Sequence, residues 1–252
     1  MQPQIFPEKL ALVIPTRYEA GNILSLLHRI HAALDGVEIG YELLIVDDDS
    51  GDGIADLVSA ISQSDTRVRF LVRRGERGLS GAILHGWQHT DAEILGVIDA
   101  DLQHPPELLP DLLTAIIEGC DLAVGSRYSK GAAVSGWNPI RRFISTAAVL
   151  ATRPLQRNGL RICDPLSGFF MVRRRCIDGI LFQKTGFKLL LEILVRGRIR
   201  SVKEIPLTFG LRHSGRSKAG LRTMFDYAAL LARLYRERLI HASPTPAITA
   251  DH

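Results

Sequence analysis

Short apolar runs alternate with helical patterns through the first half of this 252-residue chain, and this alternation limits the fold more than any other feature. Each run is close to strand length and is bounded by polar residues, glycine or proline. Strands that alternate with helices form a mostly parallel sheet covered on both faces, so the sequence predicts an α/β fold. The five runs are residues 10–14, 43–46, 68–72, 94–98 and 122–124.

Apolar residues at helical spacing predict the helices. One pattern covers residues 23–34, with Asn22 as its expected cap, and another covers residues 109–116 after two prolines. The stretch GLSGAILHG (78–86) lacks the glycine pattern of a nucleotide-binding loop, and Ser80 is expected to cap a helix there. The second half predicts a helix at 187–194, a strand at 202–209 that Pro206 interrupts, and an amphipathic helix near 221–239.

Composition favours one large domain in a reducing compartment. The chain is 46% hydrophobic, and its three cysteines lack a metal or disulfide spacing. Neither a signal peptide nor an apolar run of the roughly 18 residues needed to span a membrane is expected. We expect a short extension at 1–8, a folded domain at 9–240 and a disordered tail at 241–252.

Charge divides the chain into two unlike parts. Residues 1–126 hold 8 Lys/Arg and 20 Asp/Glu, whereas residues 127–238 hold 23 Lys/Arg and 6 Asp/Glu. Chance distribution over solvated faces would explain this. The alternative is that the acidic part handles a cation while the basic part handles phosphates or an anionic membrane surface.

Polar side chains follow several of the predicted strands, where ligands bind in sheets of this kind. Glu19 follows the first strand in VIPTRYE, and Asp47, Asp48 and Asp49 follow the second in IVDDDSGDG. Three adjacent carboxylates repel one another unless something cationic or hydrogen-bonding neutralises them. A capped loop would account for them, and so would hydrogen bonding to the base or ribose of a nucleotide.

The stretch DADLQHPPE supplies two carboxylates and an amide directly after the fourth strand. Asp99 and Asp101 are spaced so that both can turn toward one point, and Gln103 adds an amide oxygen. Hard cations such as Mg²⁺ take one or two carboxylates together with substrate phosphates. Acidic pairs are common in loops, however. His104 is either a further ligand or an ordinary loop residue, and the second interpretation is favoured. Arg127, after the fifth strand, is either a phosphate-binding residue or an ordinary surface arginine.

Taken together, the motifs resemble a known family. VIPTRYE, IVDDDSGDG, GLSGAILHG, DADLQHPPE, GSRY, DPLSGFFMVRR, GFKLLLEIL and FGLRHSGRSK occur in that order. They are similar to the dolichyl-phosphate (polyprenyl-phosphate) mannosyltransferases of glycosyltransferase family 2, and the likeness runs over residues 9–225. It implies a GT-A fold, with a Rossmann-like, mostly parallel sheet, flanking helices and a single catalytic domain without a transmembrane helix.

The resemblance also implies an activity and a location. The reaction would be inverting transfer of mannose from GDP-mannose to a polyprenyl (dolichyl) phosphate, with Mg²⁺ or Mn²⁺ as cofactor. The enzyme would be peripheral, on the cytoplasmic face of a membrane, and some members of the family rely on a membrane partner subunit. No nucleic-acid partner is expected.

Matched motif by motif, the resemblance implies roles for particular residues. Asp101 and Arg127 are the catalytic candidates. Arg17 departs from the family, which often has an aromatic residue where PTRYE has this arginine; an arginine plane can also stack on a base. The implied metal ligands are Asp99, Asp101 and Gln103. The implied donor-binding residues are Pro15, Arg17, Glu19, Val46, Asp48, Asp99, Ala100, Asp101, Gln103, Arg127, Arg212 and Lys218. Of these, Pro15, Glu19, Val46 and Asp48 would line the guanosine pocket, and Arg212 and Lys218 would hold the diphosphate. The acceptor phosphate would meet Arg141 and Ser145, with Asp164 as a further candidate.

A phosphate acceptor suits the charge pattern of the second half. A phosphate monoester has a second pKa of about 6 and is mostly dianionic at neutral pH, so it needs positive charge to position it and no general base. Arg141 and Ser145 are four residues apart, which places them on one face of a helix. The segments 140–157 and 221–239 are predicted either to lie in a membrane interface or to pack on the domain.

Three other functions remain as alternatives. The same class of enzyme would be obtained with UDP-glucose or another nucleotide sugar as donor. A phosphatase with Asp99 as its nucleophile would usually carry its acidic pair on the first strand, not the fourth. A basic nucleic-acid-binding module would explain the isoelectric point near 9.1, but the acidic strand ends argue against it.

Overall fold

The structure is a computed structural model that describes residues 8–134, 139–156, 160–184, 186, 188–210 and 221–242; in the last helix, side chains are described from 224 to 240. Within these ranges, no helix combines the length and the apolar character that crossing a bilayer requires.

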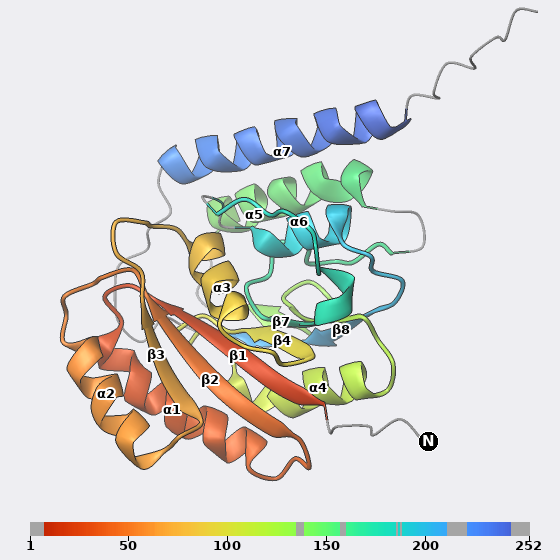
Figure 1. Cartoon of the computed structure of the whole chain (residues 1–252). Helices are drawn as coiled ribbons and strands as arrows, with labels where there is room; N and C mark the ends of the chain where they lie inside the picture. Colours follow the sequence, from red (N-terminus) through yellow and green to blue (C-terminus); the bar gives the residue numbers. More distant parts are fainter. Residues whose placement is uncertain are drawn as a thin grey trace, which may run out of the picture.

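A seven-stranded sheet forms the centre of the molecule (Figure 1). All five predicted strands are present, and β1, β2, β3 and β4 are parallel. The predicted strand at 202–209 divides at Pro206: β8 extends the main sheet, and the short β9 pairs with β6 in a second sheet. The order in the main sheet is β3 (Val68–Val72), β2 (Gly40–Asp47), β1 (Lys9–Thr16), β4 (Ile94–Val97), β7 (Phe170–Arg173), β5 (Leu122–Ser126) and β8 (Val202–Pro206).

Strand β7 is absent from the sequence prediction. It runs antiparallel between β4 and β5, with Val97 opposite Phe170. Because of this direction, the segment that precedes β7 lies at the edge where β4 and β5 end. The strand has four residues and is buried on both faces, so its sequence lacks the alternation that identifies a half-buried strand.

Helices cover both faces of the sheet, as predicted for an α/β fold. The helices α1 (Ala20–Leu34) and α4 (Leu109–Ile117) pack on one face, and α3 (Leu79–Gln88) and α6 (Leu189–Arg196) pack on the other. Alternate residues of β1 point into the two cores: Leu12 into the first and Val13 into the second. Figure 1 shows α2 (Ile54–Ser64) beside α1.

Two predicted helix caps are wrong. The cap of α1 is Glu19, and Asn22 lies inside the helix, where its amide donates to Glu19 Oε2 at 2.7 Å. The cap of α3 is Gly78, and Ser80 lies in the first turn with a buried hydroxyl that has no hydrogen-bond partner among the described residues. A positive φ of 134° at Gly78 suits glycine, which explains why the helix begins before the serine.

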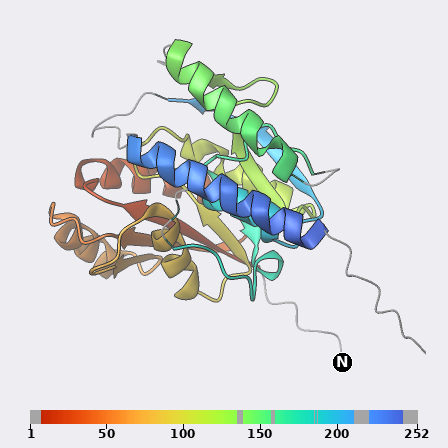
Figure 2. The same cartoon turned by 90° about the horizontal axis from the view of Figure 1, so that it is seen from above.

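The helices α5 (Pro139–Thr152) and α7 (Leu221–Ala242) form an outer layer over α6, on the same side of the molecule in both views (Figures 1 and 2). Leu230 and Leu234 of α7 are buried against Leu155, Leu166 and Leu191. The inner face of α7 therefore packs on the domain, as one of the two sequence interpretations expected.

Candidate active site

The loops that follow β1, β2, β4 and β5 meet at one edge of the sheet, because these strands run in the same direction. Three of these loops contain strained backbone. Among the described residues, the non-glycine residues with positive φ are Tyr18 (59°), Asp49 (53°) and Leu102 (61°), one in each loop after β1, β2 and β4. Such conformations cost on the order of 1 kcal/mol or more and concentrate at binding sites.

The loop after β2 neutralises its adjacent carboxylates with groups of the protein. Asp47 accepts hydrogen bonds from the backbone N–H and the hydroxyl of Ser50, at 2.7 and 2.5 Å. Asp48 pairs with the buried Arg73 at 2.8 Å and accepts the Gly78 N–H at 2.8 Å. Both oxygens of Asp48 are therefore bonded within the protein, and the contact with guanosine predicted for it would have to share them.

The residues predicted to line the guanosine pocket lie on β1, β2 and the loop between β1 and α1. Pro15 and Val46 are register partners and are both buried. Glu19 begins α1 and is half-buried. The backbone thus brings these three residues to one corner of the sheet edge.

Arg17 and Tyr18 occupy the same corner. The Arg17 guanidinium lies 5.6 Å from the centroid of the Tyr18 ring, and Tyr18 is 57% exposed. The Tyr18 N–H donates to Ser50 Oγ at 3.0 Å, which joins the loops after β1 and β2. An aromatic surface is therefore present one residue after the position where the family often has one.

The loop after β4 carries the predicted metal ligands. The side chain of Asp99 is 30% exposed, whereas Ala100 and Asp101 are buried at 3% and 7% exposure. Asp101 Oδ1 accepts the Gln103 N–H at 3.1 Å. The Gln103 side-chain amide donates to Gly210 O at 3.1 Å, so its amide oxygen is the atom that it can offer to a cation.

The donor set of this loop fits Mg²⁺ or Mn²⁺. Two carboxylates and an amide are hard oxygen ligands, which such ions prefer, and substrate phosphates usually complete the coordination. No group of three His, Cys, Asp or Glu side chains in the described part of the chain forms a metal cage. A cation held here would accordingly take its remaining ligands from a diphosphate and from water.

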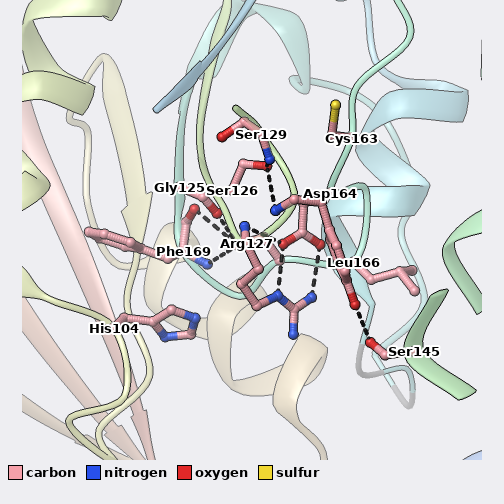
Figure 3. A network of polar contacts seen from close by, with 12 residues as sticks. His104, Gly125, Ser126, Arg127, Ser129, Ser145, Cys163, Asp164, Leu166 and Phe169 are labelled. Carbon is pink, nitrogen blue, oxygen red and sulfur yellow. Dashed lines mark hydrogen bonds and ion pairs between the residues drawn. The ribbon is translucent and has the colours of Figure 1, made fainter. Parts of the chain in front are cut away.

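Arg127, directly after β5, is held by Asp164. Its Nε and Nη2 atoms donate to the two oxygens of Asp164 at 2.7 and 2.8 Å, and its backbone N–H adds a third bond at 3.0 Å (Figure 3). Asp164 is fully buried, and the arginine keeps the pKa of its carboxyl low despite burial. These three bonds make Asp164 a residue that orients Arg127. The sequence analysis did not predict this pair.

Two further residues of this region escaped the sequence analysis. Glu204 on β8 accepts the N–H groups of Cys163 and Asp164, at 2.8 and 3.1 Å. Lys188 donates to Leu166 O at 3.0 Å, and burial lowers the pKa of its amine to about 8. Lys188 lies in the quoted GFKLLLEIL motif, but a lysine among leucines gives no signal of its own. Only the fold brings it near Arg127.

The predicted acceptor residues lie on α5. Arg141 is exposed, and Ser145 accepts a hydrogen bond from the Tyr128 hydroxyl at 2.5 Å, so this helix is attached to the loop that carries Arg127. Beside Tyr128 is a cavity of about 450 Å³. Thr146, Val149, Leu150, Arg153, Gln156 and residues 161–163 form the rest of its lining.

Arg212 and Lys218, predicted to hold the diphosphate, lie outside the described residues. The strand that leads toward them is described: β9 (Thr208–Phe209) is followed by Gly210, whose N–H donates to Gln103 O at 3.0 Å. The chain therefore leaves the described region beside the predicted metal ligands.

Comparison with known proteins gives consistent relatives. A family model described as Glycosyl transferase family 2 matches residues 11–181. A dolichol-phosphate mannosyltransferase of Pyrococcus furiosus is 40% identical over 228 residues, which cover 90% of this chain and 64% of that protein. The protein of the same name from Saccharomyces cerevisiae is 34% identical over 235 residues, covering 89% of this chain and 86% of the yeast protein. The chain thus spans slightly less than two thirds of the archaeal relative.

A solved structure confirms the fold class. Glucosyl-3-phosphoglycerate synthase from Mycobacterium tuberculosis, in complex with Mn²⁺, UDP and glucosyl-3-phosphoglycerate, superposes with a TM-score of 0.64 at 20% identity, over 92% of this chain and 80% of that chain. At this identity the likeness concerns the fold. The family match covers most of the sheet and the loops at its edge, and the chain therefore belongs to glycosyl transferase family 2 and is a glycosyltransferase.

Proposed function

We propose that the protein transfers mannose from GDP-mannose to a polyprenyl phosphate such as dolichyl phosphate, with inversion at the sugar carbon. The observation that carries this proposal is the sheet edge itself, where the acidic loop after β4 and the arginine after β5 lie on neighbouring parts of one sheet. The names of the relatives, dolichol-phosphate mannosyltransferases at 34–40% identity, support the sugar and the acceptor.

A divalent cation, Mg²⁺ or Mn²⁺, is part of the proposal. Asp99, Asp101 and Gln103 would hold it, and it would neutralise charge on the diphosphate leaving group. The structurally similar synthase contains Mn²⁺ with UDP in one crystal structure and Mg²⁺ with UDP in another, which supports a cation in this fold.

Arg127 would place a permanent positive charge beside the reacting groups. Its guanidinium is mostly buried and is oriented by Asp164, so little reorganisation is needed when negative charge develops nearby. Two N–H groups of the guanidinium donate to Asp164. The carboxylate therefore partly balances the positive charge of Arg127 before a substrate binds.

The acceptor phosphate would bind near Arg141 and Ser145 and attack without a general base, because it is already anionic at neutral pH. The cavity beside Tyr128 lies next to this position and has both apolar and cationic walls. The proposal places the protein at the cytoplasmic face of a membrane as a peripheral enzyme; the exposed apolar side chains of α5 support the contact with a membrane surface.

A panel of donors tests the donor and the acceptor together. The protein is incubated with GDP-mannose, UDP-glucose or another nucleotide sugar, a polyprenyl phosphate in detergent and Mg²⁺, and the lipid product is weighed by mass spectrometry. We expect a mannose-sized addition from GDP-mannose alone. Transfer only of another hexose would overturn the donor assignment. The acceptor assignment would be overturned if no product formed that requires the lipid phosphate.

Replacing Asp101 with asparagine tests the cation. Asp101→Asn keeps the oxygen that accepts the Gln103 N–H but removes the negative charge. We expect turnover to fall by about 100-fold or more, because the cation loses an anionic ligand, while the thermal melting curve stays close to that of the wild type. Near-wild-type turnover at saturating Mg²⁺ would contradict the assigned role.

A further inference from the structure

His104 is buried in the metal-binding loop between two aromatic rings. It is 3% exposed, and its ring centroid lies 5.5 Å from that of Phe169 and 5.2 Å from that of Phe209. Phe169 directly precedes β7, and Phe209 belongs to β9, so two elements distant in sequence hold the imidazole in place. Figure 3 shows the ring of His104 beside Phe169.

One nitrogen of this ring lacks a hydrogen bond. His104 Nδ1 is buried and has no partner within the described residues, although it lies 3.5 Å from Asp99 Oδ2. A buried polar atom without a partner is costly and calls for an explanation. Contacts at catalytic sites are often long before ligands bind, so a distance of 3.5 Å is compatible with a bond formed in the loaded enzyme.

Asp99 has little room beside Gly168. A Cβ atom added to Gly168 would lie 2.7 Å from Asp99 Oδ2, which is closer than non-bonded atoms approach. Asp99 Oδ2 is therefore close to both the backbone of Gly168 and the ring of His104.

The surroundings of His104 decide which of its ring nitrogens carries a proton. A neutral imidazole has one N–H donor and one acceptor nitrogen, and its neighbours select the tautomer. A carboxylate oxygen beside Nδ1 favours the tautomer that carries the proton on Nδ1.

We propose that His104 is a positioning residue for the metal site: its Nδ1–H donates to Asp99 Oδ2 and thereby directs Asp99 Oδ1 toward the cation. The inference rests on the proposed role of Asp99 as a metal ligand. Hydrogen bonds to a ligating carboxylate fix its orientation, and their loss typically lowers metal affinity by about 10–100-fold.

Two amide replacements separate the ring nitrogens. The amide of His104→Asn lies where Nδ1 lies, and the longer His104→Gln carries its amide near the position of Nε2. His104→Leu removes both nitrogens and keeps an apolar side chain. Thr90→Val serves as the matched control, because Thr90 is also a buried polar residue, bonded to Glu42 at 2.6 Å, but is near the opposite edge of the sheet.

Binding of Mn²⁺ is measured by the paramagnetic resonance signal of the free ion, with Mn²⁺ alone and with inorganic pyrophosphate. These probes contain neither base nor sugar, so the result does not depend on the identity of the donor. We expect His104→Gln and His104→Leu to weaken Mn²⁺ binding by about 10–100-fold, with His104→Asn and Thr90→Val close to the wild type. Thermal melting of each variant shows whether it is folded.

Unchanged Mn²⁺ affinity in folded His104→Gln would overturn the inference, and so would a loss in His104→Asn equal to that in His104→Gln. A wild-type protein that binds no Mn²⁺ under either condition would also overturn it, since the metal role of Asp99 would fail. Transfer of a hexose other than mannose would overturn the proposed donor and leave the role of His104 intact. If His104→Leu does not fold, the comparison of the two amides decides the matter.

Discussion

Asp164 and Arg127 form a deeply buried ion pair of the site, and its behaviour depends on both partners. The carboxylate is fully buried and the arginine side chain is 12% exposed. Removing one partner of such a pair leaves the other charge without solvent or a counter-ion, and this usually costs about 3–5 kcal/mol. An exposed pair costs much less, because water replaces the lost partner.

Replacing Asp164 with asparagine should therefore destabilise the fold as well as disorient Arg127. We expect Asp164→Asn to lower the free energy of unfolding by about 3 kcal/mol in urea titrations. The matched control is Glu107→Gln, which breaks the exposed pair with Arg29 and should cost about 1 kcal/mol or less. Equal losses in the two variants would contradict a special role for burial at Asp164.

His104 should make stability depend on pH in a predictable window. The unfolded chain protonates this imidazole near pH 6.5, whereas the folded protein keeps it neutral down to about pH 4. Between these pH values the unfolded state binds more protons than the folded state. The contribution of neutral His104 to the free energy of unfolding is therefore fully present above pH 6.5 and is lost as the pH falls toward 4. From pH 7 to pH 4, the wild type should lose on the order of 2–3 kcal/mol more than His104→Asn. Parallel stability curves for the two proteins would disagree with this.

At the scale of elements, the antiparallel β7 shapes the proposed metal site. Its register opposite β4 places Gly168 against the Asp99 carboxylate, and no side chain fits between them. The glycine of the DPLSGFF motif is thus required by close approach. This glycine limits where Asp99, the proposed metal ligand, can point.

A single methyl group tests this contact. Gly168→Ala should displace the Asp99 carboxylate, which we expect to lower Mn²⁺ affinity by about tenfold or more, together with an overpacking cost of about 1–3 kcal/mol. Gly36→Ala is the control, because a Cβ atom there has open space within 4 Å. Mn²⁺ titration and thermal melting are compared for the two variants. Wild-type Mn²⁺ affinity in Gly168→Ala would show that the loop adapts.

At the scale of the whole molecule, the outer layer of helices exposes apolar side chains beside basic ones. Ile140 and Phe143 of α5 are 71% and 76% exposed, and Phe225 of α7 is 73% exposed. The inner face of α7 packs on the domain through Leu230 and Leu234. The two outer helices are also joined to each other, because the Tyr227 hydroxyl of α7 donates to Ala148 O of α5 at 2.6 Å. Of the two sequence interpretations of these helices, packing is observed on their inner faces, and the membrane interface stays a prediction for their outer faces.

Vesicle binding tests the outer face. The double variant Phe143→Ser, Phe225→Ser should reduce the fraction that floats with vesicles containing anionic lipid by about tenfold or more, because burying one phenylalanine contributes about 1.5–3 kcal/mol. Leu24→Ser is the control, since this 54% exposed residue lies on α1, across the sheet from α5 and α7. Equal flotation of the double variant and the control would argue against membrane contact through these helices.

The sequence predicted the elements that local patterns encode. Apolar runs located β1 to β5, helical spacing located α1, α4 and α7, and Arg127 follows its strand as expected. It did not predict β7, whose four residues lack a period, or the helix starts, because the choice between Asn22 and Glu19 depends on how the loop before α1 is held. A pattern that repeats along the chain can be recognised from the sequence, whereas the structural role of a single residue depends on its neighbours in space.

The acidic and basic residues of the site were determined by the sequence, but their partners were determined by the tertiary structure. Asp48 meets Arg73, and Asp164 meets Arg127, across 25 and 37 residues. Burial is the largest cause of the lowered pKa values of Lys188 and His104, and the nearby charge of Arg127 lowers both further. Hydrophobic periodicity is a property of the sequence itself, whereas desolvation and ion pairing depend on which surfaces meet in the folded protein. For this protein, the sequence alone therefore determined the strands β1 to β5, the polar residues that follow them and the family. Only folding decided where β7 enters the sheet and which charged side chains at the sheet edge are already paired within the protein.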